Sequence, residues 1–448
     1  MIRATPTLAQ PALHSTQMRG RSSTKPIALA GGAAWAALIV LIITRSIPFE
    51  VRSYDELARV GLSLKNYIEI AGTVVVGLWT ARYLWGNRIS VQRLYYGHWR
   101  WFLSLCAVYL LSATWSLMPT MTIYRVADLL VASILVLTIF RSSATPSRGF
   151  LFLAYVCMLQ CLVSQAALAY MSGDWPSYVV GFLRSNPGGG IATATLVFAI
   201  FAEPGQIRWR SFHIVSAVTA SILFGSLASF LAFLVAVIYG LVAGRFRLLG
   251  FAMIALALSI VALGAIADVS VSTPERYLST LYGKSMDQVQ TATGRVGLWH
   301  EAFRFLADRP MGAGYVAGER LMTSMGNVDN SESWGAINSH DGYLSAWMAA
   351  GPLGLGLLIA FLFSLYRTLG FCRGGTAVWR AVLVSIMMNN LSVPSVGGQV
   401  DVFTIVALAV AAMPLCSGLA WESNIRAAGR REVRLPSAIG GQPTAGLT

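Results

Sequence analysis

The sequence predicts an all-α protein that spans a membrane many times, and three observations predict this fold class. Hydrophobic residues make up 56% of the 448 residues and charged residues only 12%, whereas a soluble protein carries about 25% charged residues. The apolar residues come in repeated blocks of about 17 to 25 residues, the length that a helix needs to cross about 30 Å of hydrocarbon. Basic residues are also distributed unevenly among the segments that join these blocks.

We expect about twelve spanning helices in one bundle, with both chain ends in the cytoplasm. The helices are predicted near residues 27–44, 66–81, 101–117, 123–140, 149–171, 188–202, 211–224, 227–243, 248–267, 342–366, 377–392 and 402–420. The stretch 211–243 is divided at Gly225-Ser226, because about 30 apolar residues exceed one crossing.

The predicted organisation has five parts. Residues 1–26 form a disordered cytoplasmic tail, and 27–267 hold the first nine helices. Residues 268–340 form one large loop outside the cytoplasm, between helices nine and ten. Residues 341–420 hold the last three helices, and 421–448 form a second cytoplasmic tail.

The charged residues favour this topology. The segments placed in the cytoplasm collect most of the arginines, and their acidic residues are only Glu203, Glu422 and Glu432. An excess of Lys and Arg in short cytoplasmic loops sets the orientation of membrane helices. The net charge of +14 therefore reflects topology, and we expect no nucleic-acid partner.

Several catalytic motifs are missing from the sequence. It contains no Asp-x-Asp pair, no His-Glu-x-x-His and no Gly-x-Ser-x-Gly, so metal-dependent nucleotide-sugar transferases, zinc proteases and serine hydrolases each lack their residues. Charged residues inside the predicted helices are essentially Glu69, Arg125 and Asp128, which are few for a proton-coupled transporter. We expect neither a metal nor a cofactor.

The long loop is the most polar part of the chain. Because it is placed outside the cytoplasm, where there is no ATP, a reaction there has to use an already activated substrate. Residues 294–307 are expected to form an amphipathic helix on the mouth of the bundle. Its apolar side would hold Val296, Trp299, Phe303 and Leu306, and its polar side Arg295, His300 and Arg304.

His340, at the end of this loop, is the candidate catalytic residue. We expect Asn338 or Ser339 to cap the following helix, which places the imidazole in the first helical turn. The positive helix end disfavours the imidazolium, and a neutral imidazole can accept a proton near pH 7. Asp341 favours the cation instead, so the balance stays open. The alternative is an interfacial histidine without chemistry.

The residues around His340 follow a pattern. After Asp341 come the nine residues 342–350 and then Gly351-Pro352-Leu353-Gly354. Upstream lie Thr293-Gly294-Arg295-x-x-x-Trp299 and Asp308-Arg309-Pro310-x-Gly312-x-Gly314. This arrangement resembles the signature of the O-antigen ligase and polymerase superfamily, although Asp341 stands where that signature has Asn, Ser or Gln.

The resemblance implies a metal-independent glycosyltransferase of the bacterial inner membrane, with its active site facing the periplasm. Such an enzyme transfers a glycan from undecaprenyl diphosphate to an acceptor hydroxyl. Its partners would be the lipid-linked glycan donor, a glycan or lipid A core acceptor, and membrane lipids. The resemblance leaves open whether the protein is a ligase, a polymerase or a protein O-glycosylation enzyme. A lipid-linked glycan transporter or flippase that forms no bond is the alternative.

The same resemblance assigns roles to individual residues. His340 would activate the acceptor hydroxyl, with Asp341 and Asn338 as possible supporting residues. Arginines would bind the diphosphate, since the guanidinium offers permanent charge and bidentate geometry. Arg184 and Arg295 are the candidates and Arg304 a possible support, the alternative for each being a side chain that extends to lipid headgroups. Near Arg184, exposed amides of residues 188–190 could add anion donors.

The predicted topology can be tested by thiol labelling. Single cysteines at Glu301 and Asn327 should react with a membrane-impermeant reagent supplied from outside the inner membrane, whereas cysteines at Arg245 and Arg373 should react only after that membrane is opened. Labelling of position 327 only in opened membranes would contradict the topology.

Overall fold

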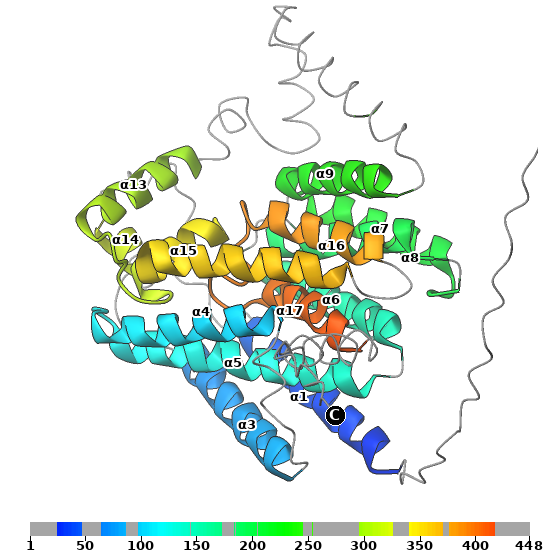
Figure 1. Ribbon diagram of the computed structural model, residues 1–448, viewed down its shortest axis with the longest axis horizontal. Helices are drawn as coiled ribbons and strands as arrows, with labels where there is room; N and C mark the ends of the chain where they lie inside the picture. Colours follow the sequence, from blue (N-terminus) through cyan, green and yellow to red (C-terminus); the bar gives the residue numbers. More distant parts are fainter. Residues whose placement is uncertain are drawn as a thin grey trace, which may run out of the picture.

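The computed structural model describes residues 25–46, 64–86, 97–143, 145–172, 183, 185–203, 205–244, 253, 295–325, 340–370 and 376–416. Every regular element in these ranges is a helix, which confirms the predicted all-α class (Figure 1). The helices are α1 (Lys25–Ser46), α3 (Leu64–Gly86), α4 (Trp99–Leu111), η2 (Ser112–Thr114), α5 (Pro119–Ser142), α6 (Pro146–Ser172), α7 (Asn186–Phe201), α8 (Arg210–Phe224), α9 (Leu227–Ala243), α13 (Arg295–Asp308), α14 (Ala317–Met325), α15 (Gly342–Leu369), α16 (Thr376–Asn389) and α17 (Val402–Cys416).

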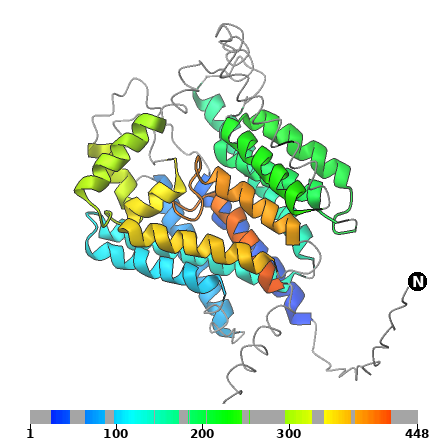
Figure 2. The same ribbon diagram turned by 45° about the horizontal axis from the view of Figure 1, so that its top comes forward.

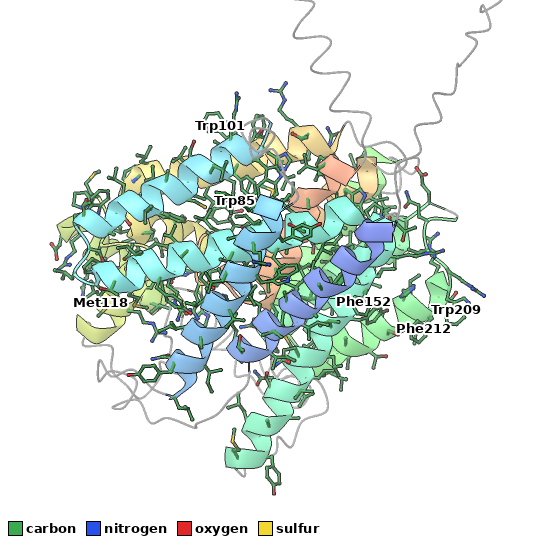
Figure 3. All side chains as sticks on the ribbon, turned by 90° about the horizontal axis from the view of Figure 1, so that it is seen from below. Trp85, Trp101, Met118, Phe152, Trp209 and Phe212 are labelled. Carbon is green, nitrogen blue, oxygen red and sulfur yellow. The ribbon has the colours of Figure 1, made fainter. Side chains whose placement is uncertain are left out.

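The described helices are suited to a membrane. Three of them, within α5, α6 and α15, are long and apolar enough to cross a bilayer by length and composition. Shorter apolar helices accompany them. Large apolar side chains project from the outer surface, among them Trp85, which is 89% exposed, and Phe212, which is 58% exposed (Figure 3). Such a surface fits contact with lipid, and the total of twelve crossings stays a prediction.

The centre of the bundle is formed by α7 and α17. Residues 188–199 of α7 and 402–413 of α17 are buried along their whole length. The two helices contact each other, and α6 and α16 pack against both. A helix that is apolar on every side is suited either to contact with lipid or to the centre of a bundle, and the neighbours of α7 and α17 enclose them. This explains the position of these two at the core.

Most helix boundaries agree with the sequence prediction. The stretch 211–243 forms two helices: α8 ends at Gly225, whose φ of 53° is left-handed, and Ser226 caps α9 by accepting the Ser229 amide at 3.3 Å. The prediction of 101–117 was wrong at its end, because α4 stops at Leu111 and Pro119 opens α5. Most of the predicted helix 248–267 and residues 268–294 lie outside the described residues.

Helices α13 and α14 lie together at one end of α15 (Figures 1 and 2). The predicted amphipathic helix is therefore present, but its buried face is Leu298, Ala302 and Leu306. The prediction that Phe303 belongs to that face was wrong, because Phe303 is 54% exposed. Trp299 is partly buried against this cluster, and the Phe303 ring meets the Trp347 ring of α15 edge to face at 6.3 Å.

Helix α15 is interrupted at the sequence Ala350-Gly351-Pro352. Ala350 has φ −147° and ψ 29°, and Gly351 has φ 65° and ψ −158°. Proline has no amide hydrogen, so the break leaves carbonyl groups of the preceding turn without helical partners. The loop after α13 supplies them: the Ala313 amide donates to the Met348 oxygen at 2.8 Å, and the Gly314 amide to the Ala349 oxygen at 3.0 Å.

The two glycine motifs of the sequence thus meet each other. A Cβ atom on Gly351 would lie 2.6 Å from the Pro310 carbonyl oxygen, and one on Gly312 would lie 2.9 Å from the Ala349 carbonyl carbon. Both glycines also have positive φ, of 65° and 74°. The segment Asp308–Gly314 and the segment Gly351–Gly354 are therefore spaced in the chain so that one backbone can dock on the other.

Gly351→Ala should destabilise the protein, because alanine is strained at this φ and its methyl group would meet the Pro310 carbonyl. We expect the free energy of unfolding to fall by about 1 to 3 kcal/mol, measured by thermal unfolding in detergent. Gly356→Ala is the matched control on the same helix, since its Cβ would have no heavy atom within 4 Å. Equal unfolding temperatures for the two variants would contradict this role for Gly351.

Candidate functional site

His340 lies directly before the residue that caps α15. Asp341 is that cap: its Oδ1 accepts the Tyr343 amide at 2.8 Å and the Leu344 amide at 3.1 Å. The expectation that Asn338 or Ser339 caps the helix was therefore wrong, and the imidazole lies just before the first turn. The carboxylate of Asp341 reaches two amides of the open helix end, which makes it an effective cap.

The backbone of His340 has an uncommon conformation. Its φ of 51° is left-handed, a region that non-glycine residues enter rarely and mostly where the surrounding structure holds them. The side chain is half-buried. A histidine held in this way at the start of a helix has a fixed position relative to the helix end.

A buried carboxylate of α14, Glu319, contacts the first turn of α15. Glu319 is 2% exposed and accepts a short hydrogen bond from the Ser345 hydroxyl. Ser345 Oγ also lies 2.7 Å from the carbonyl oxygen of Asp341. Since Ser345 is one helical turn after Asp341, these contacts join α14 to the turn that follows His340.

A second boundary of the site is the segment between α16 and α17, residues 390–401. It is irregular in structure, yet most of its residues are buried. The Gly342 amide donates to the Asn390 oxygen at 2.7 Å, so the segment contacts the first residue of α15. The Tyr315 hydroxyl donates to the Gly398 oxygen, and burial raises the pKa of Tyr315 well above its usual value, so the phenol remains a donor.

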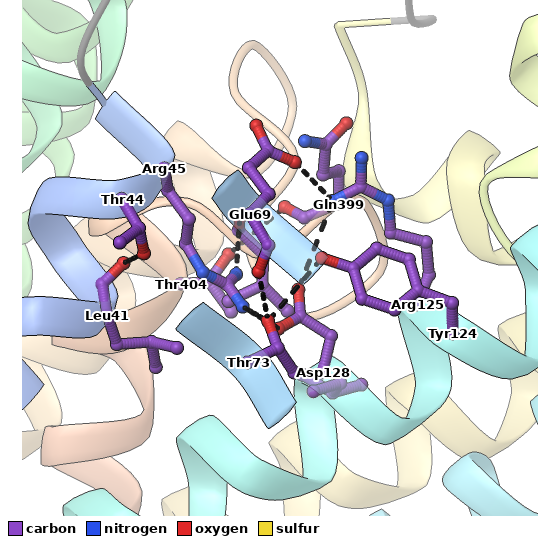
Figure 4. A network of polar contacts seen from close by, with 12 residues as sticks. Leu41, Thr44, Arg45, Glu69, Thr73, Tyr124, Arg125, Asp128, Gln399 and Thr404 are labelled. Carbon is purple, nitrogen blue, oxygen red and sulfur yellow. Dashed lines mark hydrogen bonds and ion pairs between the residues drawn. The ribbon is translucent and has the colours of Figure 1, made fainter. Parts of the chain in front are cut away.

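Beneath this segment lies a buried ion cluster that joins α1, α3 and α5 (Figure 4). Arg45 forms an ion pair with Asp128, and Arg125 Nη1 lies 3.3 Å from Glu69 Oε2. Thr73 Oγ1 lies 3.1 Å from Asp128 Oδ1. The charges balance, and each of the four charged side chains is at most 7% exposed. Charged groups at such depth are costly and commonly mark functional regions of membrane proteins.

Charged residues of the cluster also interact electrostatically with Arg320 of α14. Burial lowers the pKa of Arg320, and the charge of Arg125 lowers it further, while Glu319 and Glu69 oppose the shift. Arg320 is thus within electrostatic reach of Glu69 on α3 and Arg125 on α5. The ion cluster therefore interacts with α14, the helix whose Glu319 bonds to Ser345 near the start of α15.

The structure describes some of the predicted site residues and not others. Arg184 and Asn338 lie outside the described residues. Arg295 is the first residue of α13, and its side chain also lies outside them. Arg304 is exposed and pairs with Glu301 at 3.0 Å, and His300 is exposed on the same helix. Of the candidates, His340 and Asp341 are the pair that the structure places at the start of α15.

The glycines near Arg184 serve packing. The Gly188 amide donates to Ser185 Oγ at 3.1 Å, and the Gly189 amide donates to the Ser185 oxygen at 2.8 Å. A Cβ atom on Gly190 would lie 2.9 Å from the Phe403 ring. The expectation that these amides are exposed anion donors was therefore wrong, because Ser185 caps α7 and the glycines let α7 approach its neighbours.

Sequence reasoning missed two parts of this region. Arg45 lies just outside the predicted helix 27–44. Residues 393–401 lie between the predicted helices 377–392 and 402–420, and neither was predicted to be part of the site. A signal was present, since Glu69, Arg125 and Asp128 are the charged residues noted inside the predicted helices. Their two negative charges and one positive charge call for a further cation, which is Arg45.

These features define an all-α membrane protein in which a histidine lies directly before the start of a broken helix. The family described as O-Antigen ligase matches residues 212–359, a range that includes His340 and both glycine motifs. The match confirms the predicted resemblance to the O-antigen ligase and polymerase superfamily. Among curated proteins, no relative matches the chain.

Asp341→Ala should lower the free energy of unfolding by about 1 kcal/mol, the usual value of a helix cap. Asp341→Asn should retain most of the stability, because its amide oxygen can accept the same two backbone amides. Thermal unfolding of both variants is the measurement, with Asp308→Ala as a control on an exposed carboxylate. If Asp341→Ala unfolded at the wild-type temperature, the cap would contribute nothing to stability.

Proposed function

We propose that the protein is a membrane glycosyltransferase that transfers a glycan from undecaprenyl diphosphate to an acceptor hydroxyl at the outer face of the inner membrane. The observation that carries the proposal is the position of His340, held at the capped start of α15 within the region that matches the O-antigen ligase family. The docked glycine motifs keep this helix start in place.

In the proposed reaction, the acceptor oxygen attacks the anomeric carbon of the donor glycan. His340 takes the proton of the acceptor hydroxyl, a new carbon–oxygen bond forms, and the bond to the diphosphate breaks with its electron pair. Undecaprenyl diphosphate leaves, and a single displacement inverts the anomeric carbon. A positioned base of this kind contributes about 10²- to 10⁴-fold to a rate.

Arginines stabilise the leaving diphosphate in this proposal, because it needs fixed positive charge more than a general acid. Arg184 and Arg295 are assigned this role on sequence grounds. Arg304 is a weaker candidate, since its guanidinium already pairs with Glu301. Asp341 supports the site by capping the helix that follows the histidine. The proposed reaction uses neither a metal ion nor a cofactor.

Reconstitution tests the proposed function against transport. Purified protein in liposomes, supplied with lipid-linked glycan and a hydroxyl acceptor and without ATP, should join the two. A new glycan–acceptor bond supports a transferase, and movement of intact lipid-linked glycan without a new bond identifies a transporter instead. The length of the transferred glycan and the identity of the acceptor then distinguish ligase from polymerase and from protein O-glycosylation.

His340→Ala should lower turnover by about 10²- to 10⁴-fold while the lipid-linked donor still binds. The reason is that an imidazole before a helix cap adds little to packing, so folding and binding should persist. Turnover and donor binding of the purified variant are the measurements. His300→Ala is the matched control, since that histidine is exposed on α13 and its loss should be nearly silent. Near-normal turnover of His340→Ala would remove His340 from the mechanism.

A further inference from the structure

The segment 390–401 is an irregular stretch of backbone inside an apolar bundle. In a membrane protein, backbone of this kind is tolerated only where protein groups or a water-filled cavity satisfy its amides and carbonyls. Hydrogen bonds within the segment satisfy some of these groups, since Asn390 Oδ1 accepts both the amide and the hydroxyl of Ser395 at 2.7 Å. The Thr404 hydroxyl donates to the Ser395 oxygen at 2.8 Å.

Three carbonyl groups of the segment are bound from outside, each by a different element. The Asn390 oxygen accepts the Gly342 amide of α15 at 2.7 Å. The Gly398 oxygen accepts the hydroxyl of Tyr315, from the loop that docks on the α15 break. The Val400 oxygen accepts Arg45 Nη1 of α1 at 3.2 Å. The segment is thus held from outside at its first residue and at two residues near its end.

The contact with α15 is close enough to transmit a displacement. A Cβ atom on Gly342 would overlap the Asn390 side chain, and one on Gly397 would overlap the Gly342 carbonyl group. No intervening side chain can absorb a movement between these two backbones. A shift of the segment would therefore move Gly342, two residues after His340.

Arg45 is the described residue that joins this segment to the ion cluster. It pairs with Asp128, and its other guanidinium nitrogen reaches the Val400 oxygen. Asp128 is fully buried, and its Oδ2 atom has no hydrogen-bond partner among the described residues. Buried ion pairs contribute little net stability compared with apolar packing, so a role in fixing one geometry explains this pair better than stability does.

We propose that Arg45, held by Asp128, is a positioning residue: it fixes segment 390–401 and, through Asn390 and Gly342, the start of α15 that carries His340. The inference rests on the proposed function in taking His340 as the catalytic base. Asp128 pairs with Arg45, and Arg45 donates to the Val400 oxygen. The backbone of the segment then leads from Val400 to Asn390, whose oxygen accepts the Gly342 amide of α15.

The kinetic test is Arg45→Lys, which keeps the charge beside Asp128 but loses the planar fork that reaches two partners. The expected result is a fall in kcat of about 100-fold per folded molecule, as for a small misplacement of a reacting group, with the KM for donor unchanged. Asp128→Asn should lower kcat in the same way, and it replaces Arg45→Lys as the test if that variant folds poorly. Tyr239→Phe is the control, since it removes a half-buried 2.8 Å contact with Tyr366 and should leave kcat unchanged.

The structural test needs no activity. Val396, 2% exposed, is replaced by cysteine in a protein whose native cysteines are replaced by alanine. Its reaction with a water-soluble thiol reagent should be slow, and at least about tenfold faster when Arg45→Lys or Asp128→Asn is added. Unchanged labelling, or unchanged kcat in both variants, would overturn the inference. If wild-type protein forms no product at all, the proposed function fails while the labelling result still decides whether Arg45 fixes the segment.

Discussion

The requirement that buried backbone groups be hydrogen-bonded governs this structure more than any other constraint. In an apolar bundle, a helix can break only where other protein groups supply the missing partners. The chain breaks twice near its candidate site, at Ala350-Gly351-Pro352 within α15 and at segment 390–401 between α16 and α17. Partners for both come from the region after α13, which donates amides to the first break and the Tyr315 hydroxyl to the second.

This arrangement explains why the candidate site is rigid although it is built from loops. His340 lies outside the helix, in a left-handed conformation, but every side of the helix start is held. Asp341 caps its amides, Glu319 bonds to Ser345, and Asn390 accepts the Gly342 amide. A general base has to be placed within hydrogen-bond distance of its proton, so the rigidity of this helix start matters for the proposed chemistry.

Charge is used in two different ways in the described residues. On the exposed face of α13, Arg304 pairs with Glu301 in a setting where an ion pair contributes little to stability. In the interior, Arg45, Asp128, Arg125 and Glu69 form a neutral cluster at high desolvation cost. The interior pairs specify how α1, α3 and α5 meet. Because Arg45 also bonds to Val400, they specify where segment 390–401 lies.

The sequence by itself determined the class of the protein and much of its helix pattern. Apolar blocks of crossing length set where α5, α6 and α15 run, and Gly225-Ser226 separates α8 from α9 as predicted. The glycine motifs indicated a resemblance to the superfamily, which the match over residues 212–359 confirms. These features depend on local composition and spacing, which a single sequence carries.

Only the tertiary structure decided which distant groups meet. Local spacing correctly predicted Leu306 on the buried face of α13, but it also predicted Phe303 there, and packing against α15 buries Leu298 and Ala302 instead. It predicted the cap at Asn338 or Ser339, but the geometry of the helix start selected Asp341. The pairing of Arg45 with Asp128 joins residues far apart in the chain, and the contact of Arg45 with Val400 spans 355 positions. Such partners are fixed by the assembly of helices, because nothing in the local sequence says which buried charges will face each other.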